Sequence, residues 1–257
     1  MSSKLTNARS LYEVGIRDGK PREAVFAFTG ERYTQHSTGV RDGKEGFIEF
    51  FEPFLQRNPV RHIELVRSFE DGQYVFVHAY QSLNHGEAQW VTMDFFDTDK
   101  DNKIIEHWDV IVPFKGANAS GHTQVDGSKD VTDLDQTDKN KALVRAMIQD
   151  LLMPEGNVDS IESYIAPEYI QHNLEVADGI DAFSQLLNDP KRTLWYHDIV
   201  LLIGCGNFVA TLSRASKANQ EYAQADLFRI ESGKIVEHWD AAEPVPAQDK
   251  LVNSGKF

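Results

Sequence analysis

The sequence predicts an α+β protein built from two tandem copies of one domain, each with helices packed on a curved antiparallel sheet. Two pairs of matching segments predict the duplication. YTQH at 33–36 recurs as YIQH at 169–172, and KIIEHWD at 103–109 recurs as KIVEHWD at 234–240. Each half also begins with the apolar spacing of helices and ends in β-rich segments. Matches that keep the same order over both halves indicate an internal repeat.

A polar segment separates the two copies. Residues 115–136 are rich in Gly, Ser, Asp and Thr and hold few large apolar side chains. Such a segment buries too little surface to offset the entropy that it loses on ordering. We therefore expect one domain at 1–114, a linker at 115–134 and a second domain at 135–257.

Amphipathic spacing predicts two helices in each half. They are expected at 4–18, 43–57, 137–152 and from Asp178 to just before Pro190. Asp42 and Glu45 have the spacing of a capping box at the start of the second helix. Pro53 lies inside that helix and is expected to kink or shorten it.

The rest of each half has the β-branched and aromatic composition of strands. Four antiparallel strands are expected per copy, at 60–69, 73–82, 88–97 and 103–112 in the first and at 194–203, 207–215, 221–231 and 234–242 in the second. A sheet that curves around helices leaves a pocket between the two layers.

The register of the last hairpin predicts which side chains share a face. A two-residue turn would pair Glu231 with Lys234 and, further along, Asp226 with Trp239. One face would then hold Asp226, Glu237 and Trp239 and, by the repeat, Asp94, Glu106 and Trp108. The other face would hold His107, Asp109, His238 and Asp240.

Charge and cysteine content exclude several classes of function. The chain has 26 Lys and Arg against 40 Asp and Glu, a formal net charge of −14. Phosphate backbones and anionic membranes repel such a chain, so we expect no nucleic-acid partner and no membrane partner. The single Cys205 allows neither an internal disulfide nor a Cys-rich zinc site. Without an apolar leader or a membrane-length apolar run, a cytoplasmic location is expected.

The order of these segments resembles a known family. Helices and a meander followed by DFFxxDxxxKIIEHWD at 94–109 or DLFRIESGKIVEHWD at 226–240 resemble the SnoaL-like polyketide cyclases in both halves. YxQH together with the final EHWD resembles the subgroup of SnoaL-like aldol-condensation enzymes. The resemblance implies the cone-shaped, cystatin-like α+β fold of nuclear transport factor 2. It also implies chemistry without a cofactor, with a pocket carboxylate as general acid/base at the positions of Asp94 and Asp226.

The same resemblance implies a mode of assembly. Single domains of this fold commonly dimerise through their sheets. A duplicated chain is therefore expected to form an internal pseudo-dimer, and a homodimer of chains stays open.

Four side chains are the candidate catalytic groups: Asp94, His36, His78 and Asp109. Asp94 shares its strand face with aromatic side chains, and burial against such rings raises the pKa of a carboxyl group. That suits a group that exchanges protons near neutral pH, where histidine also titrates. A structural role is the alternative for each: Asp94 could hold the sheet through a hydrogen-bonded pair, and His78 could be a satisfied core histidine.

Further candidate ligand contacts are repeated polar or aromatic positions, or lie beside the four catalytic candidates: Tyr33, His62, Trp90, Glu106, His107, Trp108, His172, Asp226, Glu237 and Trp239. The EHWD motif could instead stabilise the last strand or line an interface between the halves. The histidines and carboxylates show no tight metal-ligand spacing, so no metal site is expected.

We therefore expect a small-molecule enzyme that acts on an apolar carbonyl compound by cofactor-independent acid/base chemistry, through aldol cyclisation or isomerisation. One alternative is a non-catalytic binder of a small ligand, and another is a dehydratase or epoxide hydrolase on the same fold. The hydrolase needs an arginine near its carboxylates, and the strand of Asp94 carries none. His78 has Leu212 as its counterpart, so the first half is the better candidate for an intact site.

Overall fold

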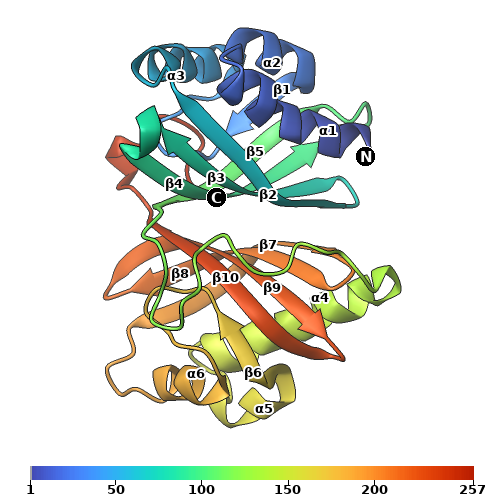
Figure 1. Ribbon diagram of the computed structural model, residues 1–257, viewed down its shortest axis with the longest axis vertical. Coiled ribbons are helices and arrows are strands. Elements are labelled where there is room, and N and C mark those ends of the chain that lie inside the picture. Colours follow the sequence, from blue (N-terminus) through green and yellow to red (C-terminus); the bar gives the residue numbers. More distant parts are fainter. Residues whose placement is uncertain (1) are drawn as a thin grey trace. The chain divides into compact units, whose positions relative to one another are not determined.

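The chain folds into two compact units, as described for residues 2–257 by the computed structural model. The first unit is the chain up to Phe114 together with Pro246–Phe257, and the second is Lys115–Val245. In each unit, helices cover one face of a five-stranded sheet (Figure 1). The α+β class and the tandem arrangement expected from the repeat are confirmed.

The helices of the first unit are α1 (Ser3–Ser10), α2 (Pro21–Phe28) and α3 (Gly43–Arg57). A π-helical segment, Leu11–Arg17, continues α1, so the two together fill the helix expected at 4–18. The sequence analysis missed α2, a short helix that has a proline in its first turn, where the missing N–H leaves no hydrogen bond unmade.

The sheet of the first unit contains one strand more than expected. Its strands are β1 (Thr29–Gln35), β2 (Arg61–Asp71), β3 (Tyr74–Leu83), β4 (Ala88–Thr98) and β5 (Ile104–Pro113). Their order is β1-β5-β4-β3-β2, and β1 pairs with β5 in parallel. The expectation of four antiparallel strands is therefore wrong at this edge. The strand β1 has the sequence TGERYTQ, whose burial does not alternate, so it lacks the period-two signal.

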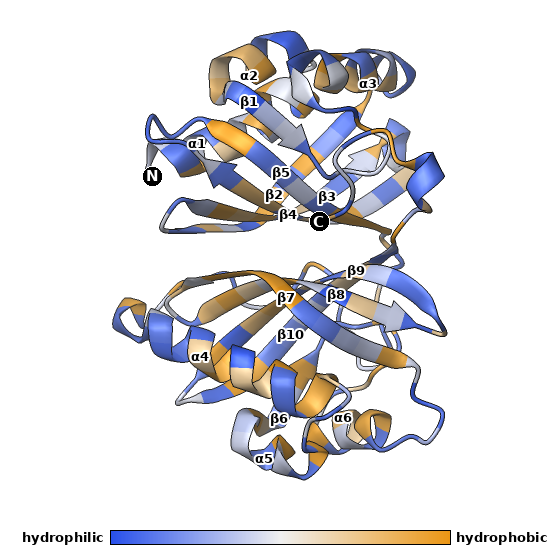
Figure 2. Cartoon of the chain, turned by 180° about the vertical axis from the view of Figure 1, so that it is seen from behind, coloured by the Kyte–Doolittle hydropathy of each residue, from blue (hydrophilic) through white to orange (hydrophobic). Residues whose placement is uncertain are grey.

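The second unit repeats this topology. Its helices are α4 (Thr137–Met147), α5 (Ile161–Tyr164) and α6 (Ile180–Leu187), and a π-helical segment, Ile148–Leu152, continues α4. Its strands are β6 (Ile165–Gln171), β7 (Leu194–Cys205), β8 (Phe208–Lys217), β9 (Gln220–Glu231) and β10 (Lys234–Pro244), in the order β6-β10-β9-β8-β7. Figure 2 shows the amphipathic pattern of α4, with apolar and polar residues on different sides.

Short 3₁₀ segments connect these elements at Asn84–Gly86, Leu134–Gln136, Val158–Ser160 and Gln248–Lys250. Within residues 2–257, every helix is too short or too polar to cross a membrane.

Two predictions about α3 differ from the structure. Asp42 is the N-cap residue, but its side chain does not cap the helix. Its Oδ1 instead accepts a hydrogen bond from the backbone N–H of Gln35, at 2.7 Å, and so holds the loop before the helix. Asp178 accepts from the N–H of Gln171 in the same way, at 2.9 Å. The helix also continues through Pro53 to Arg57.

Each sheet contains a β-bulge, and as a result the predicted assignment of side chains to the two faces of the sheet is wrong. Along β4 and β5, the pair Thr98–Ile104 is followed by Asp97–Glu106, so Ile105 is an extra residue. Val236 is the extra residue of β10. Because a shift of one residue moves every later side chain to the opposite face, the bulge changes the pairing for the rest of the strand.

The shifted register pairs Asp94 with Asp109 and, in the second unit, Asp226 with Asp240. The prediction that Asp94 shares a face with Glu106 and Trp108 is therefore wrong. Asp94 lies with His107 and Asp109 on the face that the helices cover, where all three line one cavity.

The first unit is completed by the segment that follows the second repeat. Asn253 donates from Nδ2 to the carbonyl oxygens of Ser37 and Val40, both at 2.7 Å. The carbonyl oxygen of Gly255 lies 2.5 Å from Nδ1 of His36. These contacts attach the tail, which the sequence analysis assigned to the second domain, to the loop after β1.

The second unit is completed in the corresponding way by the segment that follows the first repeat. Asn118 donates from Nδ2 to the carbonyl oxygens of Gln171, at 2.7 Å, and Asn173, at 3.1 Å. The carbonyl oxygen of Thr123 lies 2.7 Å from Nδ1 of His172. Much of the stretch expected to be a linker is thus an ordered part of this unit.

A substitution at Gly127 tests how closely the segment that follows the first repeat packs against the second sheet. It has φ +86°, and an added Cβ would contact the Glu237 carboxylate and lie 2.7 Å from Cζ2 of Trp239. We expect Gly127→Ala to lower the free energy of unfolding by about 1–3 kcal/mol more than its control, the usual range for overpacking. The control is Gly121→Ala, because Gly121 has φ +91° and no atom within 4 Å of its Cβ position. Equal losses of stability in urea titrations of the two variants would contradict this packing.

Candidate functional site

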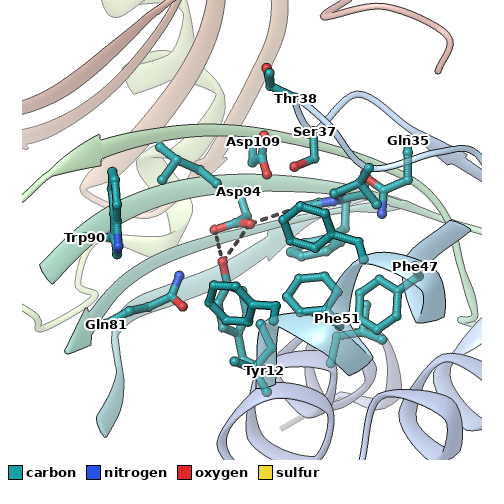
Figure 3. A pocket seen from close by; sticks show the side chains of 18 of the residues that line it. Tyr12, Gln35, Ser37, Thr38, Phe47, Phe51, Gln81, Trp90, Asp94 and Asp109 are labelled. Carbon is teal, nitrogen blue, oxygen red and sulfur yellow. Dashed lines mark hydrogen bonds and ion pairs between the residues drawn. The ribbon is translucent and has the colours of Figure 1, made fainter. Parts of the chain in front are cut away.

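A cavity of about 230 Å³ lies between the helices and the sheet of the first unit. Its walls are mostly apolar, and α3 supplies four of the aromatic side chains: Phe47, Phe50, Phe51 and Phe54. Their spacing of three and four residues places them along one stripe of the helix. Figure 3 shows Phe47 and Phe51 on the helical side of the cavity and Asp94 and Trp90 on the sheet side.

The polar floor of the cavity centres on Asp94. Its Oδ1 lies 2.9 Å from Nε2 of His107, and Nδ1 of His107 lies 3.0 Å from Oε1 of Gln35. The hydroxyl of Tyr12 donates to the Asp94 carboxylate at 2.8 Å (Figure 3) and lies 2.9 Å from the hydroxyl of Thr92. Two elements thus contact this carboxylate directly, the π-helical segment after α1 and β5, and β1 joins them through the contact of Gln35 with His107.

Both ring nitrogens of His107 face oxygen atoms. If Nδ1 donates to the amide oxygen of Gln35, then a single proton is shared between Nε2 of His107 and Asp94. The pair exists as imidazolium with carboxylate or as imidazole with carboxylic acid, so moving one proton along one hydrogen bond converts an ion pair into a neutral pair.

Burial sets the electrostatics of this floor. Asp94 is 1% exposed, and burial raises the pKa of its carboxyl group, although His107 and Tyr12 oppose that shift. The charge of Asp109 raises it further. Burial, together with the charge of Asp94, also raises the pKa of Tyr12 well above its usual value, so that phenol keeps its proton.

Asp109 differs from Asp94 because a cation contacts it. Nζ of Lys256 lies 3.1 Å from Oδ1 of Asp109, and the two side chains are 2% and 5% exposed. Burial alone would raise the pKa of Asp109, but Lys256, His107 and the hydroxyl of Ser37 hold it below its usual value. The tail therefore supplies the positive charge that balances the second carboxylate of the cavity.

The second unit has a related polar group without this cation. Nε2 of His238 lies 3.0 Å from Oδ1 of Asp226, and the hydroxyl of Tyr196 donates to the same carboxylate at 3.0 and 3.2 Å. Asp240 accepts from the amides of Asn173 and Gln224, at 2.7 and 3.3 Å. Burial raises the pKa of Asp240, whereas Lys256, His107 and Ser37 hold that of Asp109 below its usual value, so the surroundings shift the pKa of this aspartate in opposite directions in the two units.

The structure brings together only part of the site expected from the sequence. The predicted residues that line the cavity are Tyr33, Trp90, Asp94, His107 and Asp109. The others lie elsewhere, because the bulge reverses the expected faces or because their own strand position points away.

His36, Glu106 and Trp108 form a separate cluster on the other face of the first sheet. Nε2 of His36 lies 2.9 Å from Oε1 of Glu106, and its ring stacks on Trp108 at a centroid distance of 4.8 Å. His172, Glu237 and Trp239 repeat this arrangement in the second unit, at 2.9 and 4.6 Å. The candidate catalytic residue His36 therefore lies outside the cavity that contains Asp94.

The other two histidines also lie away from the cavity. His78 is fully buried, is paired across the sheet with Met93, and has Nδ1 3.2 Å from Nη1 of Arg67. It therefore belongs to the face opposite Asp94, as a core histidine. His62 is exposed on β2.

Several residues of the site escaped the sequence analysis. Tyr12, Gln35 and Gln81 line the cavity. Gln35 had a signal, since it stands inside the repeated YxQH motif. Tyr12 is not repeated: in the second unit the equivalent hydroxyl comes from Tyr196 on β7. Nothing in the sequence indicated Lys256, because it follows the second repeat whereas the cavity lies in the first unit.

Comparison with known proteins agrees with this architecture. The sequence pattern described as the SnoaL-like domain matches residues 8–107 and again 144–238. The chain belongs to the SnoaL-like domain family. Two copies of the SnoaL-like domain stand in tandem, and no curated protein matched the chain.

Similar solved structures each cover one copy. A "putative polyketide cyclase" from Bacillus cereus is 22% identical and covers 42% of this chain and 74% of its own, with a TM-score of 0.38. IdmH from Streptomyces antibioticus is 15% identical over 42% and 91%, with a TM-score of 0.37. An LEH-like epoxide hydrolase from M. tuberculosis is 16% identical over 42% and 85%, with a TM-score of 0.36. These likenesses do not distinguish among activities.

The Lys256–Asp109 pair gives a stability prediction. Lys256→Met leaves a carboxylate buried without its cation, so we expect a loss of about 3–5 kcal/mol in the free energy of unfolding at pH 7. Since the folded-state pKa of Asp109 is lowered, its contribution is present above the unfolded pKa and disappears as pH falls through the folded pKa. The difference between wild type and variant should therefore shrink in acid.

Urea titrations across this pH range measure the effect, with Lys250→Met as control, because Lys250 is an exposed lysine of the same tail. Asp109→Asn removes the carboxylate, so Lys256→Met should cost much less in that background. An undiminished cost there would show that Lys256 does not act through Asp109.

Proposed function

We propose that the first unit is a small-molecule enzyme that performs cofactor-independent acid/base chemistry on an apolar carbonyl compound, by aldol closure or isomerisation. The observation that carries the proposal is the Asp94–His107 pair, a carboxylate and an imidazole 2.9 Å apart at the floor of an apolar cavity. A base of this kind needs a pKa near the working pH, and burial moves Asp94 in that direction.

The cavity sets the class of substrate. Phenylalanine side chains of α3 and the ring of Trp90 favour an apolar body that excludes water. The polar groups at the floor are few, so a substrate that presents one or two carbonyl oxygens to them can be oriented without leaving buried donors unpaired.

Asp94 is the proposed base. Its Oδ1 accepts from His107, and both of its oxygens accept from Tyr12. In the proposed step, the carboxylate takes a proton from the carbon next to the substrate carbonyl, and the bonding pair becomes part of an enolate. The enolate carbon then attacks a second carbonyl carbon, and the oxygen of that carbonyl takes the proton from Asp94 as its π bond breaks. In an isomerisation, the proton returns from Asp94 to another carbon of the enolate system instead.

His107 and Tyr12 have supporting roles in this step. His107 keeps its own proton in the hydrogen bond to Asp94 and orients the carboxylate, while the proton taken from carbon stays on Asp94 until it is returned to the product. The phenol of Tyr12 keeps its proton, because burial and Asp94 raise its pKa. Once Asp94 has taken the substrate's proton, the single hydroxyl hydrogen of Tyr12 can turn from Asp94 to the enolate oxygen.

A binding protein is the second candidate function, and one observation favours it. The second unit holds the same carboxylate, histidine and tyrosine groups at Asp226, which is also fully buried. A group repeated in both units can serve to maintain the fold. An epoxide hydrolase receives less support, since none of the cavity-lining residues is an arginine.

Proton exchange provides a test that needs no natural substrate. With 2-tetralone in D₂O, NMR should show faster exchange of the protons beside the carbonyl when the protein is present. Asp94→Asn keeps the size and removes the base, so the rate should fall roughly 10²–10⁴-fold. Asp226→Asn is the matched control in the second unit and should change the rate little.

Binding of 2-naphthol, whose hydroxyl resembles an enol, separates the two candidate functions. The enzyme predicts that Asp94→Asn loses exchange while 2-naphthol still binds. A binding protein would hold 2-naphthol and catalyse no exchange. Unaltered exchange in Asp94→Asn, at unchanged thermal stability, would remove Asp94 as the base.

The pH dependence of exchange gives a further prediction. The base must be deprotonated, so the rate should rise with pH through an apparent pKa above about 3.9, the usual value for aspartate. This pKa belongs to the Asp94–His107 pair. Asp109→Asn removes a negative charge that raises the pKa of Asp94, so the apparent pKa of the exchange rate should shift to lower pH. If the apparent pKa measured with the same ketone were unchanged in Asp109→Asn, the charge of Asp109 would not influence the group that transfers the proton.

A further inference from the structure

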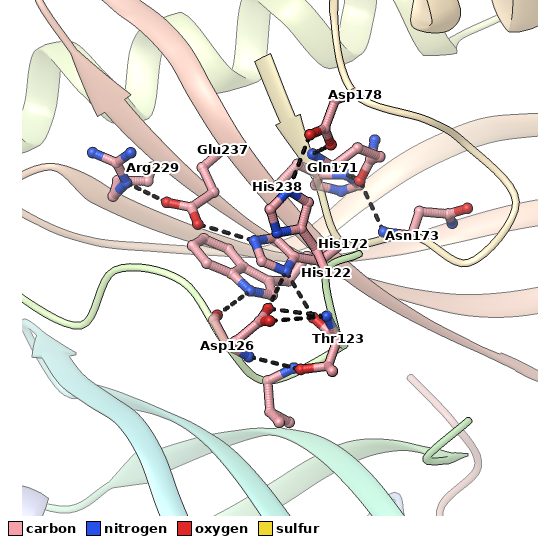
Figure 4. Close-up of polar contacts among 12 residues, drawn as sticks. His122, Thr123, Asp126, Gln171, His172, Asn173, Asp178, Arg229, Glu237 and His238 are labelled. Atoms are coloured by element: carbon pink, nitrogen blue, oxygen red, sulfur yellow. Dashed lines mark hydrogen bonds and ion pairs between the residues drawn. The ribbon is translucent and has the colours of Figure 1, made fainter. Parts of the chain in front are cut away.

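A second cluster of polar side chains lies in the second unit, outside the proposed catalytic floor. A ring nitrogen of His122, a carboxylate oxygen of Asp126 and a ring nitrogen of His172 all lie within 4.8 Å of one another. His122 and Asp126 belong to the segment that follows the first repeat, and His172 follows β6. Figure 4 shows these three side chains converging.

Each histidine of this cluster has a carboxylate at one ring nitrogen. Nε2 of His172 lies 2.9 Å from Oε1 of Glu237, and Nε2 of His122 lies 3.0 Å from Oδ2 of Asp178 (Figure 4). An imidazole N–H donated to a carboxylate fixes the tautomer and makes the other nitrogen a better metal ligand. For both residues that other nitrogen is Nδ1.

Nδ1 of His172 faces two oxygen atoms. It lies 2.7 Å from the carbonyl oxygen of Thr123 and 2.9 Å from Oδ1 of Asp126. When the ring carries its proton on Nε2, a lone pair on Nδ1 would point at oxygen lone pairs. A positive centre, either a proton or a metal ion, is therefore required between these atoms.

The first unit provides an internal comparison. His36 has the same surroundings as His172: the carboxylate of Glu106, the ring of Trp108 and a backbone carbonyl, that of Gly255. The tail residues that contact this loop lie within NSGKF at 253–257, which contains no histidine and no aspartate. The shared contacts are explained by attachment of the segment that follows each repeat. At His172, the side chains of His122 and Asp126 are present beside these shared contacts.

We propose that His122, Asp126 and His172 bind a divalent transition metal ion, with zinc as the best match. Two imidazoles and one carboxylate form a ligand set that zinc accepts, and they leave a fourth position for water. The side chains of His122 and Asp126 are 32% and 44% exposed, whereas that of His172 is fully buried. An ion can therefore enter from the loop side.

Bound there, the ion would link the segment that follows the first repeat, which holds His122 and Asp126, to the sheet of the second unit. His172 lies with Glu237 and Trp239, on the face opposite Asp226 and His238. The metal site is thus separate from the carboxylate groups considered for acid/base chemistry. It escaped sequence spacing because the fold, and not a short motif, brings the ligands together.

Isothermal titration of chelator-treated protein with ZnCl₂ tests the site. We expect saturable binding of one Zn²⁺ per chain and a higher Tm with Zn²⁺ present. His122→Ala and Asp126→Asn should each weaken binding by at least about tenfold, the scale known for metal-site substitutions. His197→Ala, which removes an exposed histidine of β7 in the same unit, should leave binding unchanged.

Circular dichroism of each variant shows that it is folded, and Asp126→Asn keeps an oxygen that can accept from the N–H of Thr123. Visible absorption of bound Co²⁺ provides a second readout on wild type and Asp126→Asn. The proposal is overturned by wild-type protein that binds no Zn²⁺ stoichiometrically. Equal affinity in wild type, His122→Ala and Asp126→Asn would overturn it as well, and would assign the positive centre to a proton on His172.

Discussion

One extra residue in the last strand of the first sheet determines which side chains face the cavity. At Ile105, the bulge between β4 and β5 brings Asp94, His107 and Asp109 to the covered face of the sheet. A regular hairpin would have sent His107 and Asp109 to the opposite side and left Asp94 facing the cavity without its imidazole. The same residue sends Glu106 and Trp108 outward, where they hold His36 and the tail.

The bulge is repeated at Val236, yet the two units have diverged in what surrounds it. In the first unit the phenol comes from a helix and a lysine balances the second aspartate. In the second unit the phenol comes from a strand and amides replace the lysine. The sheet therefore maintains a carboxylate–imidazole pair in both places, while the elements around it shift the pKa of the second aspartate in opposite directions.

The sequence predicts the duplication and the α+β class well, because repeated motifs and apolar periodicity survive in a single chain. It also identifies Asp94, since the residue sits among aromatic positions of a strand. It fails at Ile105, because a bulge leaves no periodic signal over so short a stretch. It fails at Lys256 for another reason: the contact depends on which repeat the tail packs against, and neither composition nor spacing records that choice.

The exchanged tail has a consequence for biosynthesis. A ribosome makes the first repeat early, and its sheet and helices can form while the second repeat is still being translated. The charge of Asp109 is not balanced until Lys256 has emerged, after both repeats have been made. Until then the nascent first unit carries an uncompensated buried carboxylate, which takes up a proton or keeps that corner open to water. Translation thus assembles the cavity first and adjusts its charge last.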